Sequence, residues 1–250
     1  MADSRGNGST LPTNSSRTSA EPARRRALYG RRLGRPLKAG REQALAEWLP
    51  RLGVTIPAAG RLLPAALFPG GIDDLWLEVG FGSGEHLLAQ AAAHPRTGLI
   101  GCEPFINGMA ALLAEIAREP APANHIRVLM DDARPLIAAL PDGVLGRVFV
   151  LFPDPWPKAR HAKRRFISGE NLDALARVMK PGAELRAASD DEGYIAWAAE
   201  HLHAHAAFEP LRRESEWRDR PADWPVTRYE AKARAAGRRP AFFAVRRRAA

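Results

Sequence analysis

Leu75-Trp76-Leu77-Glu78-Val79-Gly80-Phe81-Gly82-Ser83-Gly84 is the stretch that decides the fold of this chain. Its first five residues have the apolar pattern of a buried strand, and residues 84–93 have the pattern of a helix. Between the two lie three alternate glycines, which let a ligand approach the backbone and leave the amides of the following helix accessible. The stretch therefore predicts a strand, a glycine turn and a helix, with a ligand site at the turn.

The same alternation of strand and helix continues downstream. Five strands are predicted, at residues 75–79, 99–102, 126–130, 147–152 and 183–188. Helices are predicted at residues 84–93, 105–118, 134–140, 165–179 and 192–205. A last strand at residues 241–245 is expected to pair antiparallel. The pattern predicts an α/β, Rossmann-like fold, which has a mostly parallel sheet, helices on both faces and an antiparallel C-terminal strand.

Three regions follow from composition. Residues 1–22 are rich in Ser, Thr, Asn, Gly and Pro, and we expect a disordered N-terminal tail. Residues 23–73 are expected to form a basic arm and connector, in which residues 40–52 form a short helix or an extended arm. Residues 74–250 are expected to form the main domain.

The net charge of +9 on 250 residues is unevenly distributed. Residues 1–50 hold ten Lys or Arg against four acids, and residues 211–250 hold twelve against five. Such basic ends on an acidic body favour a polyanionic partner over a merely solvated surface.

One cysteine, Cys102, excludes an internal disulfide, and no stretch resembles a membrane span or a secretory signal. We therefore expect a soluble cytoplasmic protein without a membrane partner, either a monomer or a homodimer.

Three acidic residues favour S-adenosylmethionine at the glycine turn. Glu78 lies two residues before the first glycine, where a carboxylate suits a cationic ligand better than a pyrophosphate. Glu103 ends the second strand and is placed to accept hydrogen bonds from a ribose diol. Asp132 follows the third strand, where an adenine amino group can be recognised. A nicotinamide or flavin dinucleotide is less favoured because the G-x-G-x-x-G spacing fails, and a purely structural turn is the remaining alternative.

A second motif follows the fourth strand, Phe152-Pro153-Asp154-Pro155-Trp156-Pro157-Lys158, with a basic run through Arg165 behind it. The prolines stiffen the loop because each fixes its own φ and restricts the preceding residue. An acid, an aromatic face and dense positive charge at the carboxyl end of a strand suit a nucleotide within a nucleic acid.

The chain closely resembles the bacterial tRNA (guanine-N7-)-methyltransferase family over about residues 24–248. The resemblance rests on the glycine turn, on the Pro-Asp-Pro-Trp loop with its basic run, and on shorter matches at Tyr29–Arg32, Gly101–Pro104, Asp132-Ala133, Ser189-Asp190 with Tyr194, and Thr227–Glu230. It implies a class I methyltransferase fold, S-adenosylmethionine as cofactor, tRNA as partner and no metal.

The resemblance also implies roles for individual residues. The cofactor would be bound by Glu78, Gly80, Gly82, Gly84, Glu103, Asp132 and Asp154. The tRNA would be bound by Lys158, Arg160, His161, Arg164, Arg165, Asp190, Thr227, Arg228, Tyr229 and Glu230. Asp154 is the catalytic candidate, and we assign it to guanine orientation and charge stabilisation, because N7 carries no proton to abstract.

Two alternatives remain open at this point. One is a methyltransferase that acts on an exocyclic amine of a base in a nucleic acid. The other is a tRNA-binding protein without catalysis, against which the presence of Glu78, Glu103 and Asp154 argues.

Overall fold

The computed structural model describes residues 30–249, so the predicted tail at residues 1–22 and the start of the basic arm lie outside the described part. The strands are β1 (Asp74–Val79), β2 (Thr97–Cys102), β3 (Ile126–Leu129), β4 (Leu145–Leu151), β5 (Met179–Ser189), β6 (Phe208–Pro210) and β7 (Ala241–Arg247). The α-helices are α1 (Ala39–Leu52), α2 (Pro64–Leu67), α3 (Glu85–Ala93), α4 (Ile106–Arg118), α5 (Ala133–Ala139), α6 (Gly169–Val178), α7 (Glu192–Ala204) and α8 (Arg228–Ala235). Short 3-10 helices occupy Ala121–Asn124, Ala159–Arg164 and Glu214–Glu216.

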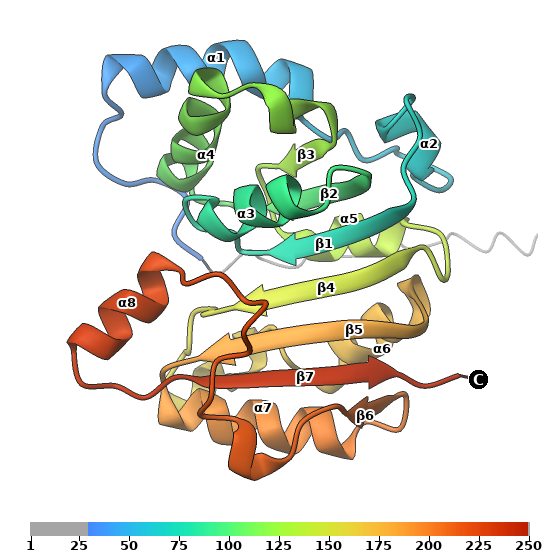
Figure 1. The fold of residues 1–250 in the computed structure, drawn as a ribbon, viewed down its shortest axis with the longest axis vertical. Coiled ribbons are helices and arrows are strands. Elements are labelled where there is room, and N and C mark those ends of the chain that lie inside the picture. Colours follow the sequence, from blue (N-terminus) through green and yellow to red (C-terminus); the bar gives the residue numbers. More distant parts are fainter. Residues whose placement is uncertain (1–29, 250) are drawn as a thin grey trace, which may run out of the picture.

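The strands form a sheet with the order β3-β2-β1-β4-β5-β7-β6 (Figure 1). Strands β1 to β5 pair in parallel, and β7 pairs antiparallel with both β5 and β6. The predicted fold class is therefore confirmed, including the antiparallel strand near the C-terminus. The strand order reverses between β1 and β4, and in open α/β sheets a crevice for ligands forms beyond the carboxyl ends of the strands at such a point.

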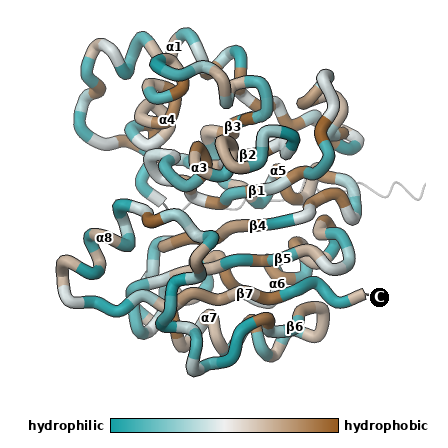
Figure 2. The backbone as a smooth tube through the Cα atoms, in the orientation of Figure 1, coloured by the Kyte–Doolittle hydropathy of each residue, from teal (hydrophilic) through white to brown (hydrophobic). Residues whose placement is uncertain are grey.

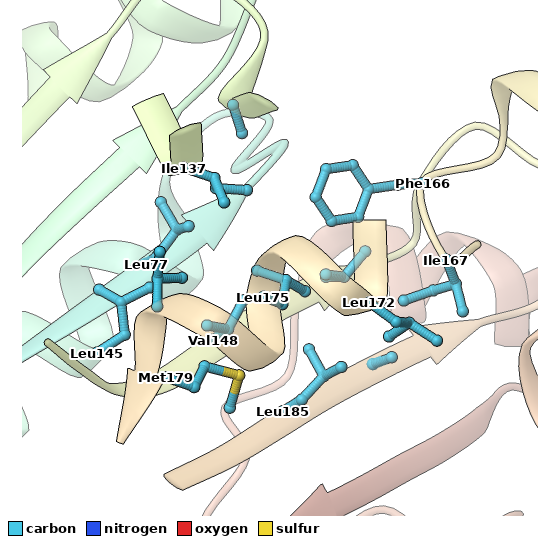
Figure 3. Close-up of a cluster of buried hydrophobic side chains, with 14 of the residues drawn as sticks. Leu77, Ile137, Leu145, Val148, Phe166, Ile167, Leu172, Leu175, Met179 and Leu185 are labelled. Carbon is cyan, nitrogen blue, oxygen red and sulfur yellow. The ribbon is translucent and has the colours of Figure 1, made fainter. Parts of the chain in front are cut away.

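Each strand sends alternate side chains to opposite faces of the sheet. Leu77 of β1 and Val148 of β4 pack against the α6 residues Leu172 and Leu175 on one face (Figure 3). Trp76 of β1 and Phe149 of β4 instead share a cluster with α1, α3 and α4 on the other face. The sheet is thus covered on both sides, as its near-continuous apolar strands require.

The chain before β1 is part of this packing. Residues 40–52 belong to the helix α1, which resolves the choice between a short helix and an extended arm. Its buried residues Ala44, Trp48 and Leu52 recur every four positions, and α1 packs against α4 (Figure 1). The connector also buries Leu62 and Phe68, so it contributes to the core of the sheet domain.

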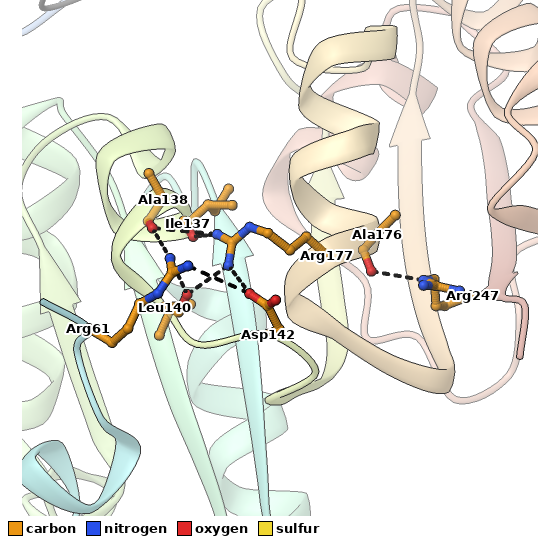
Figure 4. A network of polar contacts seen from close by, with 8 residues as sticks. All are labelled: Arg61, Ile137, Ala138, Leu140, Asp142, Ala176, Arg177 and Arg247. Atoms are coloured by element: carbon orange, nitrogen blue, oxygen red, sulfur yellow. Dashed lines mark hydrogen bonds and ion pairs between the residues drawn. The ribbon is translucent and has the colours of Figure 1, made fainter. Parts of the chain in front are cut away.

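A polar network closes the end of α5. The last carbonyls of a helix lack partners within it, and here arginines from elsewhere supply donors (Figure 4). Arg177 of α6 donates to the carbonyls of Ile137 and Leu140 at 2.7 and 3.0 Å and to Asp142 Oδ1 at 2.6 Å. Arg61 from the connector donates to the carbonyl of Ala138 at 2.8 Å. These bonds join the connector, α5 and α6.

Several predicted bounds were wrong. The helix predicted at residues 165–179 begins only at Gly169, because Phe166 and Ile167 are buried and the chain enters the helix at Ser168. The strand predicted at residues 183–188 begins earlier, at Met179. Helix α8 was not predicted from the sequence, although its Tyr229 lines a cavity at the end of the sheet.

Candidate functional site

A cavity of about 630 Å³, here called the first cavity, lies at the reversal of strand order, beyond the ends of β1, β2 and β4. It is lined by Gly30 and Arg31 of the arm, Val79, Gly80 and Gly82 of the glycine turn, Cys102 to Phe105 after β2, Asp131 to Arg134 after β3, Phe152, Pro153, Asp154 and Trp156 of the loop after β4, and Arg164, Phe166 and Tyr229. Segments spread over two hundred residues of sequence therefore meet at one site.

The glycine turn presents bare backbone to this cavity. Gly80 and Gly82 have φ values of +73° and +62°, a region that glycine adopts readily. A Cβ on Gly80 would meet no heavy atom within 4 Å, so the wall there borders open space. Gly84 is not part of the wall, and a Cβ on it would come within 2.5 Å of Leu112. Two of the three predicted glycines thus line the cavity, and the third permits close packing at the start of α3.

Glu103 is held rigidly in the wall. Its side chain is buried, Oε2 accepts from the Gly82 N–H at 2.7 Å, and Oε1 accepts from the Phe105 N–H at 2.9 Å. Burial raises the pKa of this carboxyl, partly offset by the two backbone donors, and the charge of Asp154 acts in the same direction as burial. A carboxylate has more lone pairs than these two bonds use, so Glu103 can still accept from ligand hydroxyls.

Asp132 lines the cavity at the start of α5. Its carboxylate accepts from the Arg134 N–H at 2.9 Å and pairs with the Arg134 guanidinium at 2.7 Å. The neighbouring Asp131 pairs with Arg32 of the arm at 2.8 Å. The arm is also held by a bond from the Ile106 N–H to the Arg32 carbonyl at 3.0 Å. The arm therefore crosses the mouth of the cavity beside these acids.

Glu78 does not line the first cavity. It has the same parity as Trp76 in β1, so its side chain faces α3, where its Oε2 lies 2.9 Å from His86 Nδ1. Gln90 continues the chain of polar contacts, with its Nε2 3.3 Å from His86 Nε2, and all three side chains are buried. The structure places Glu78 behind the glycine turn, where a direct ligand contact has no geometric support. No contact between His86 and Glu78 was predicted from the sequence.

The loop after β4 adopts an unusual backbone conformation. Phe152 and Trp156 have φ values of +51° and +45°, which is uncommon for residues with side chains and costs conformational energy. Arg165 holds this loop, donating to the carbonyls of Pro155 and Trp156 at 2.9 and 3.3 Å. The Arg165 side chain is buried, so the phosphate contact predicted for it does not fit its position. Its role in this structure is to fix the loop.

Asp154 is the exposed acid of the same loop, and its side chain lines the first cavity. The Trp156 ring beside it lies 5.8 Å from the His161 ring and 4.8 Å from the Arg164 guanidinium. Trp156 is thus wedged against the basic run and also borders the cavity. Asp154 therefore lies at the mouth of the first cavity, between the two residues with positive φ, Phe152 and Trp156.

Arg164 lines the first cavity, and the exposed members of the basic run lie outside its wall. Lys158 and Arg160 are exposed, and His161 is half-buried on the 3-10 helix. Partial desolvation and the cations Arg164, Arg160 and Lys158 lower the pKa of His161, so this ring is neutral at pH 7. The exposed cations form a positive surface next to the mouth of the first cavity.

Helix α8 brings the predicted run from Thr227 to Glu230 to the cavity. Thr227 caps the helix by accepting from the Glu230 N–H at 3.2 Å. Tyr229 lines the cavity, and its ring lies so close to Gly82 that a Cβ there would come within 2.7 Å of it. Arg228 pairs with Glu85 of α3 at 3.4 Å. Two adjacent side chains thereby fasten α8 to the glycine turn.

Glu230 has a different position from the other residues of this run. It is almost fully buried and pairs with Arg234 at 2.8 Å and Arg220 at 3.5 Å. The predicted substrate contact does not fit this burial, and Glu230 anchors α8 instead. In Figure 2 most of α8 is hydrophilic, so such polar anchors hold it in place of a wide apolar face. The Thr-x-x-Glu spacing is a capping-box signature that would have indicated the helix.

Asp190 lies apart from the first cavity. It follows β5 and pairs with Arg238 at 2.6 Å in the wall of a separate hollow. The structure therefore does not bring Asp190 together with Asp154 in one cavity.

Two histidines outside the site, and the cysteine in its wall, have structural surroundings. The His201 ring stacks on Trp197 at 3.9 Å, and His205 Nε2 lies 3.1 Å from Asp173. Cys102 is buried, and burial raises the pKa of its thiol, which suppresses nucleophilic use. Within residues 30–249 no three His, Cys, Asp or Glu side chains gather as metal ligands. In the same range no helix has the length and apolar character needed to cross a bilayer.

The arrangement suits a ligand with a diol, a planar ring and positive charge, placed beside a second ligand that enters past a cationic surface. Glu103 and the glycine backbone serve the inner part of the first cavity. Asp154, Trp156 and Tyr229 border the cavity on the side of the exposed cations of the basic run.

Comparisons with known proteins show what this chain is similar to. A family model described as "Putative methyltransferase" matches residues 73–242. A protein of Paramagnetospirillum magneticum named tRNA (guanine-N(7)-)-methyltransferase is 54% identical over 91% of this chain and 95% of its own length. A protein of Rhodospirillum rubrum with the same name is 52% identical over 91% of this chain and 90% of its own. The crystal structure of the antibiotic-resistance methyltransferase Kmr aligns with 79% of this chain and 99% of its own, at 23% identity and a TM-score of 0.49.

Proposed function

The chain belongs to the tRNA (guanine-N(7)-)-methyltransferase family, and from that premise we propose that it transfers a methyl group from S-adenosylmethionine to N7 of a guanosine in tRNA. The proposed partner is tRNA, and the cytoplasm is the location proposed with it. The sequence similarity to the named relatives covers 91% of this chain. The match to the family model, over residues 73–242, includes the glycine turn and α8.

The donor set of the first cavity suits the cofactor. Glu103 retains lone pairs for a ribose diol, and Asp132 offers acceptor oxygens toward an adenine amino group. The open space at Gly80 leaves room for the ligand beside bare backbone. When bound, S-adenosylmethionine supplies an electrophilic methyl group.

Methylation of guanine at N7 requires little proton transfer by the protein. N7 carries a lone pair and no proton, so no general base is needed. Positive charge develops on the purine during transfer, and a fixed carboxylate aimed at that charge lowers the barrier. Asp154 suits this role because the loop around it is held by Arg165. Holding the base in line contributes much of the remaining acceleration.

One observation carries the proposal: Glu103 and Asp154 line the same cavity at the reversal of strand order. Glu103, which follows β2, can accept hydrogen bonds from the ribose, and Asp154, which follows β4, lies beside the surface proposed for the nucleic acid. The exposed cations Lys158 and Arg160 adjoin this cavity and suit tRNA phosphates.

A direct experiment is methylation of unmodified tRNA with radiolabelled S-adenosylmethionine, followed by digestion to nucleosides. We expect the label in N7-methylguanosine, at one position when the tRNA is mapped. Label in an exocyclic amine would show that the protein is a methyltransferase that acts on a different atom of the base. Tight tRNA binding with neither label nor cofactor binding would instead indicate a binding protein without catalysis.

A further inference from the structure

The loop that carries Asp154 is held at both ends. At its start the Phe152 N–H donates to the Ala188 carbonyl of β5 at 2.8 Å. At its end the buried guanidinium of Arg165 donates to two successive carbonyls. A proline on each side of Asp154 fixes its own φ, so the span between the two ends has little freedom. The orientation of this acid therefore depends on how firmly the two ends are held.

The contact with Arg165 depends on the left-handed backbone at Trp156. The guanidinium donates to the carbonyl of Pro155, just before Trp156, at 2.9 Å and to that of Trp156 itself at 3.3 Å. In extended backbone successive carbonyls point to opposite sides, so one side chain cannot reach both. At Trp156, with a φ of +45°, they lie on the same side. The two bonds therefore offset part of the energetic cost of this conformation, and without them the loop would relax toward the extended region.

Helix α7 holds the Arg165 side chain in turn. The guanidinium lies 5.0 Å from the centre of the Trp197 ring and 5.8 Å from that of the Tyr194 ring, distances at which a cation is attracted to an aromatic face. A third carbonyl, that of Gly193, lies 3.5 Å away. The same two aromatic residues bind Ile167, whose N–H donates to the Tyr194 hydroxyl at 3.3 Å and whose carbonyl accepts from Trp197 Nε1 at 2.5 Å. Arg165 is thus fixed by α7 on one side and fixes the loop on the other.

The contacts of Arg165 differ from those of the exposed cations in its run. Its side chain is buried, and its partners in the described part of the chain are uncharged, namely three carbonyls and two aromatic rings. A guanidinium enclosed in this way cannot reach a phosphate without releasing the loop. Lys158 and Arg160 are exposed by contrast. Loss of Arg165 should therefore disturb the loop, whereas loss of an exposed cation should weaken contact with the nucleic acid.

We propose that Arg165 is a positioning residue for methyl transfer, held in place by Tyr194 and Trp197. It keeps the loop in the left-handed conformation that presents Asp154 to the first cavity, so this carboxylate does not have to be oriented when the guanine arrives. This inference rests on the proposed function, because Arg165 acts only through Asp154. It gives two aromatic residues of α7 a role in a reaction whose cavity they do not line.

The test compares Arg165→Gln with Arg177→Gln in single-turnover methylation of tRNA. Arg177 is a matched control because it also donates to main-chain carbonyls, those of Ile137 and Leu140 at the end of α5. We expect Arg165→Gln to lower the rate at saturating tRNA by about a hundredfold, the cost of a small misplacement of a reacting group. The affinities for tRNA and for S-adenosylhomocysteine should stay within about threefold, because Arg165 holds neither Glu103 nor the exposed cations that supply electrostatic affinity. Arg177→Gln should change none of these quantities.

A double-mutant cycle with Asp154→Ala separates positioning from general damage. Adding Arg165→Gln to Asp154→Ala should slow the reaction by less than about threefold more, because the two residues act as one unit. Rate losses that multiply would contradict the proposal, and so would an Arg165→Gln variant that keeps its rate. A lower slope of log K for tRNA against log salt in Arg165→Gln would show a phosphate contact and would contradict the proposal as well.

Arg165→Lys covers the case in which the glutamine variant does not fold. Lysine keeps a cation beside the α7 rings and a donor for one carbonyl, but it lacks the planar fork that holds both carbonyls. Its rate should fall by about tenfold, a smaller misplacement, and this loss should vanish in the Asp154→Ala background. A lysine variant that keeps the full rate, or whose loss persists in that background, would contradict the proposal.

Trp197→Leu tests the contribution of α7, since it removes one of the two rings against Arg165. It should lower the rate in the same direction and with the same dependence on Asp154, and a full rate would contradict the role of this ring. Absence of N7-methylguanosine with the unsubstituted protein would contradict the proposed function itself. A normal digest combined with rate losses that multiply would contradict only the positioning role of Arg165.

Discussion

At the scale of single residues, the first cavity contains two carboxylates with different surroundings. Glu103 is buried, and its two oxygens accept from backbone donors. Asp154 is exposed on a loop whose carbonyls are held by Arg165. The first suits a fixed acceptor for a ligand, and the second suits a charge presented to a substrate that arrives from solvent. Each role leads to its own prediction.

Glu103 should make ligand binding depend on pH. Because burial raises its pKa, the ionised acceptor is lost at a higher pH than for an exposed glutamate as the solution is acidified. Calorimetric titration with S-adenosylhomocysteine should show constant affinity above this pKa and weaker binding below it. Glu103→Gln should weaken binding about tenfold or more at pH 8, the effect of one hydrogen bond to a charged group, and should flatten the pH profile. An unchanged profile in this variant would exclude Glu103 as the titrating group. Glu119→Gln serves as control, since Glu119 is exposed and does not line the first cavity.

Asp154→Ala should separate turnover from binding. We expect the rate of methyl transfer to fall by about a hundredfold or more, the size seen when one electrostatic contact to a transition state is removed. Affinity for tRNA, measured by filter binding, should stay within about twofold because the cationic surface is intact. Equal losses of both quantities would show that Asp154 holds the tRNA and has no separate effect on the reaction.

At the scale of elements, α8 connects the two halves of the site. It is fastened to α3 through Arg228 and Glu85, and it lays Tyr229 on the glycine turn. Its inner anchor is the buried Glu230 with its arginine partners. The position of α8 therefore determines whether Tyr229 completes the wall of the first cavity.

Loss of the Tyr229 ring should weaken cofactor binding. We expect Tyr229→Ala to raise the dissociation constant for S-adenosylhomocysteine roughly two- to tenfold, equivalent to the 0.5–1.5 kcal/mol of an aromatic contact. Val226→Ala is the matched control, since Val226 is an exposed apolar residue that precedes α8 and does not line the cavity. If both variants bind alike, the ring is not part of the binding site. Tyr229→Phe should retain most of the affinity.

The central sheet could be predicted from the sequence because its strands are continuous apolar runs bounded by glycine and proline. An example is the strand that contains Glu78 and ends before the glycines that run to Gly84. The sequence failed to predict α8, whose Ala and Arg residues give no apolar period and whose stability comes from the distant partner Arg220. It also could not show which way Glu78 points, because that depends on which face of the sheet α3 covers. The burial of Arg165 could not be predicted for a similar reason, since a cation in a basic run gives no sign that it packs under a loop.

At the scale of the whole molecule, positive charge gathers near one edge of the sheet. The basic run adjoins the first cavity. The separate hollow at Asp190 is lined by three arginines and three acids, so its formal charges cancel. A strand bound beside the first cavity would therefore meet exposed cations such as Lys158 and Arg160. Much of the affinity for tRNA is therefore expected to be electrostatic and sensitive to salt.

Removing two exposed cations should lower that sensitivity. Arg160→Ala combined with Lys163→Ala should reduce the slope of log K for tRNA against log salt by about 1.5, since each lost phosphate contact removes roughly 0.7–0.9. The affinity for S-adenosylhomocysteine should not change, as neither residue lines the first cavity. Arg96→Ala with Arg118→Ala removes equal charge elsewhere on the surface and should leave the slope as it is. Equal slopes for the two double variants would contradict a defined tRNA surface.

The walls of the first cavity begin at Gly30 and are completed only by Tyr229. During synthesis the pocket therefore cannot exist until nearly the whole polypeptide has left the ribosome. Chain growth at 5–20 residues per second separates these two residues by roughly 10–40 s. Throughout that interval the nascent chain must fold without any help from its small-molecule ligand, so the early sheet has to be stable by its own packing.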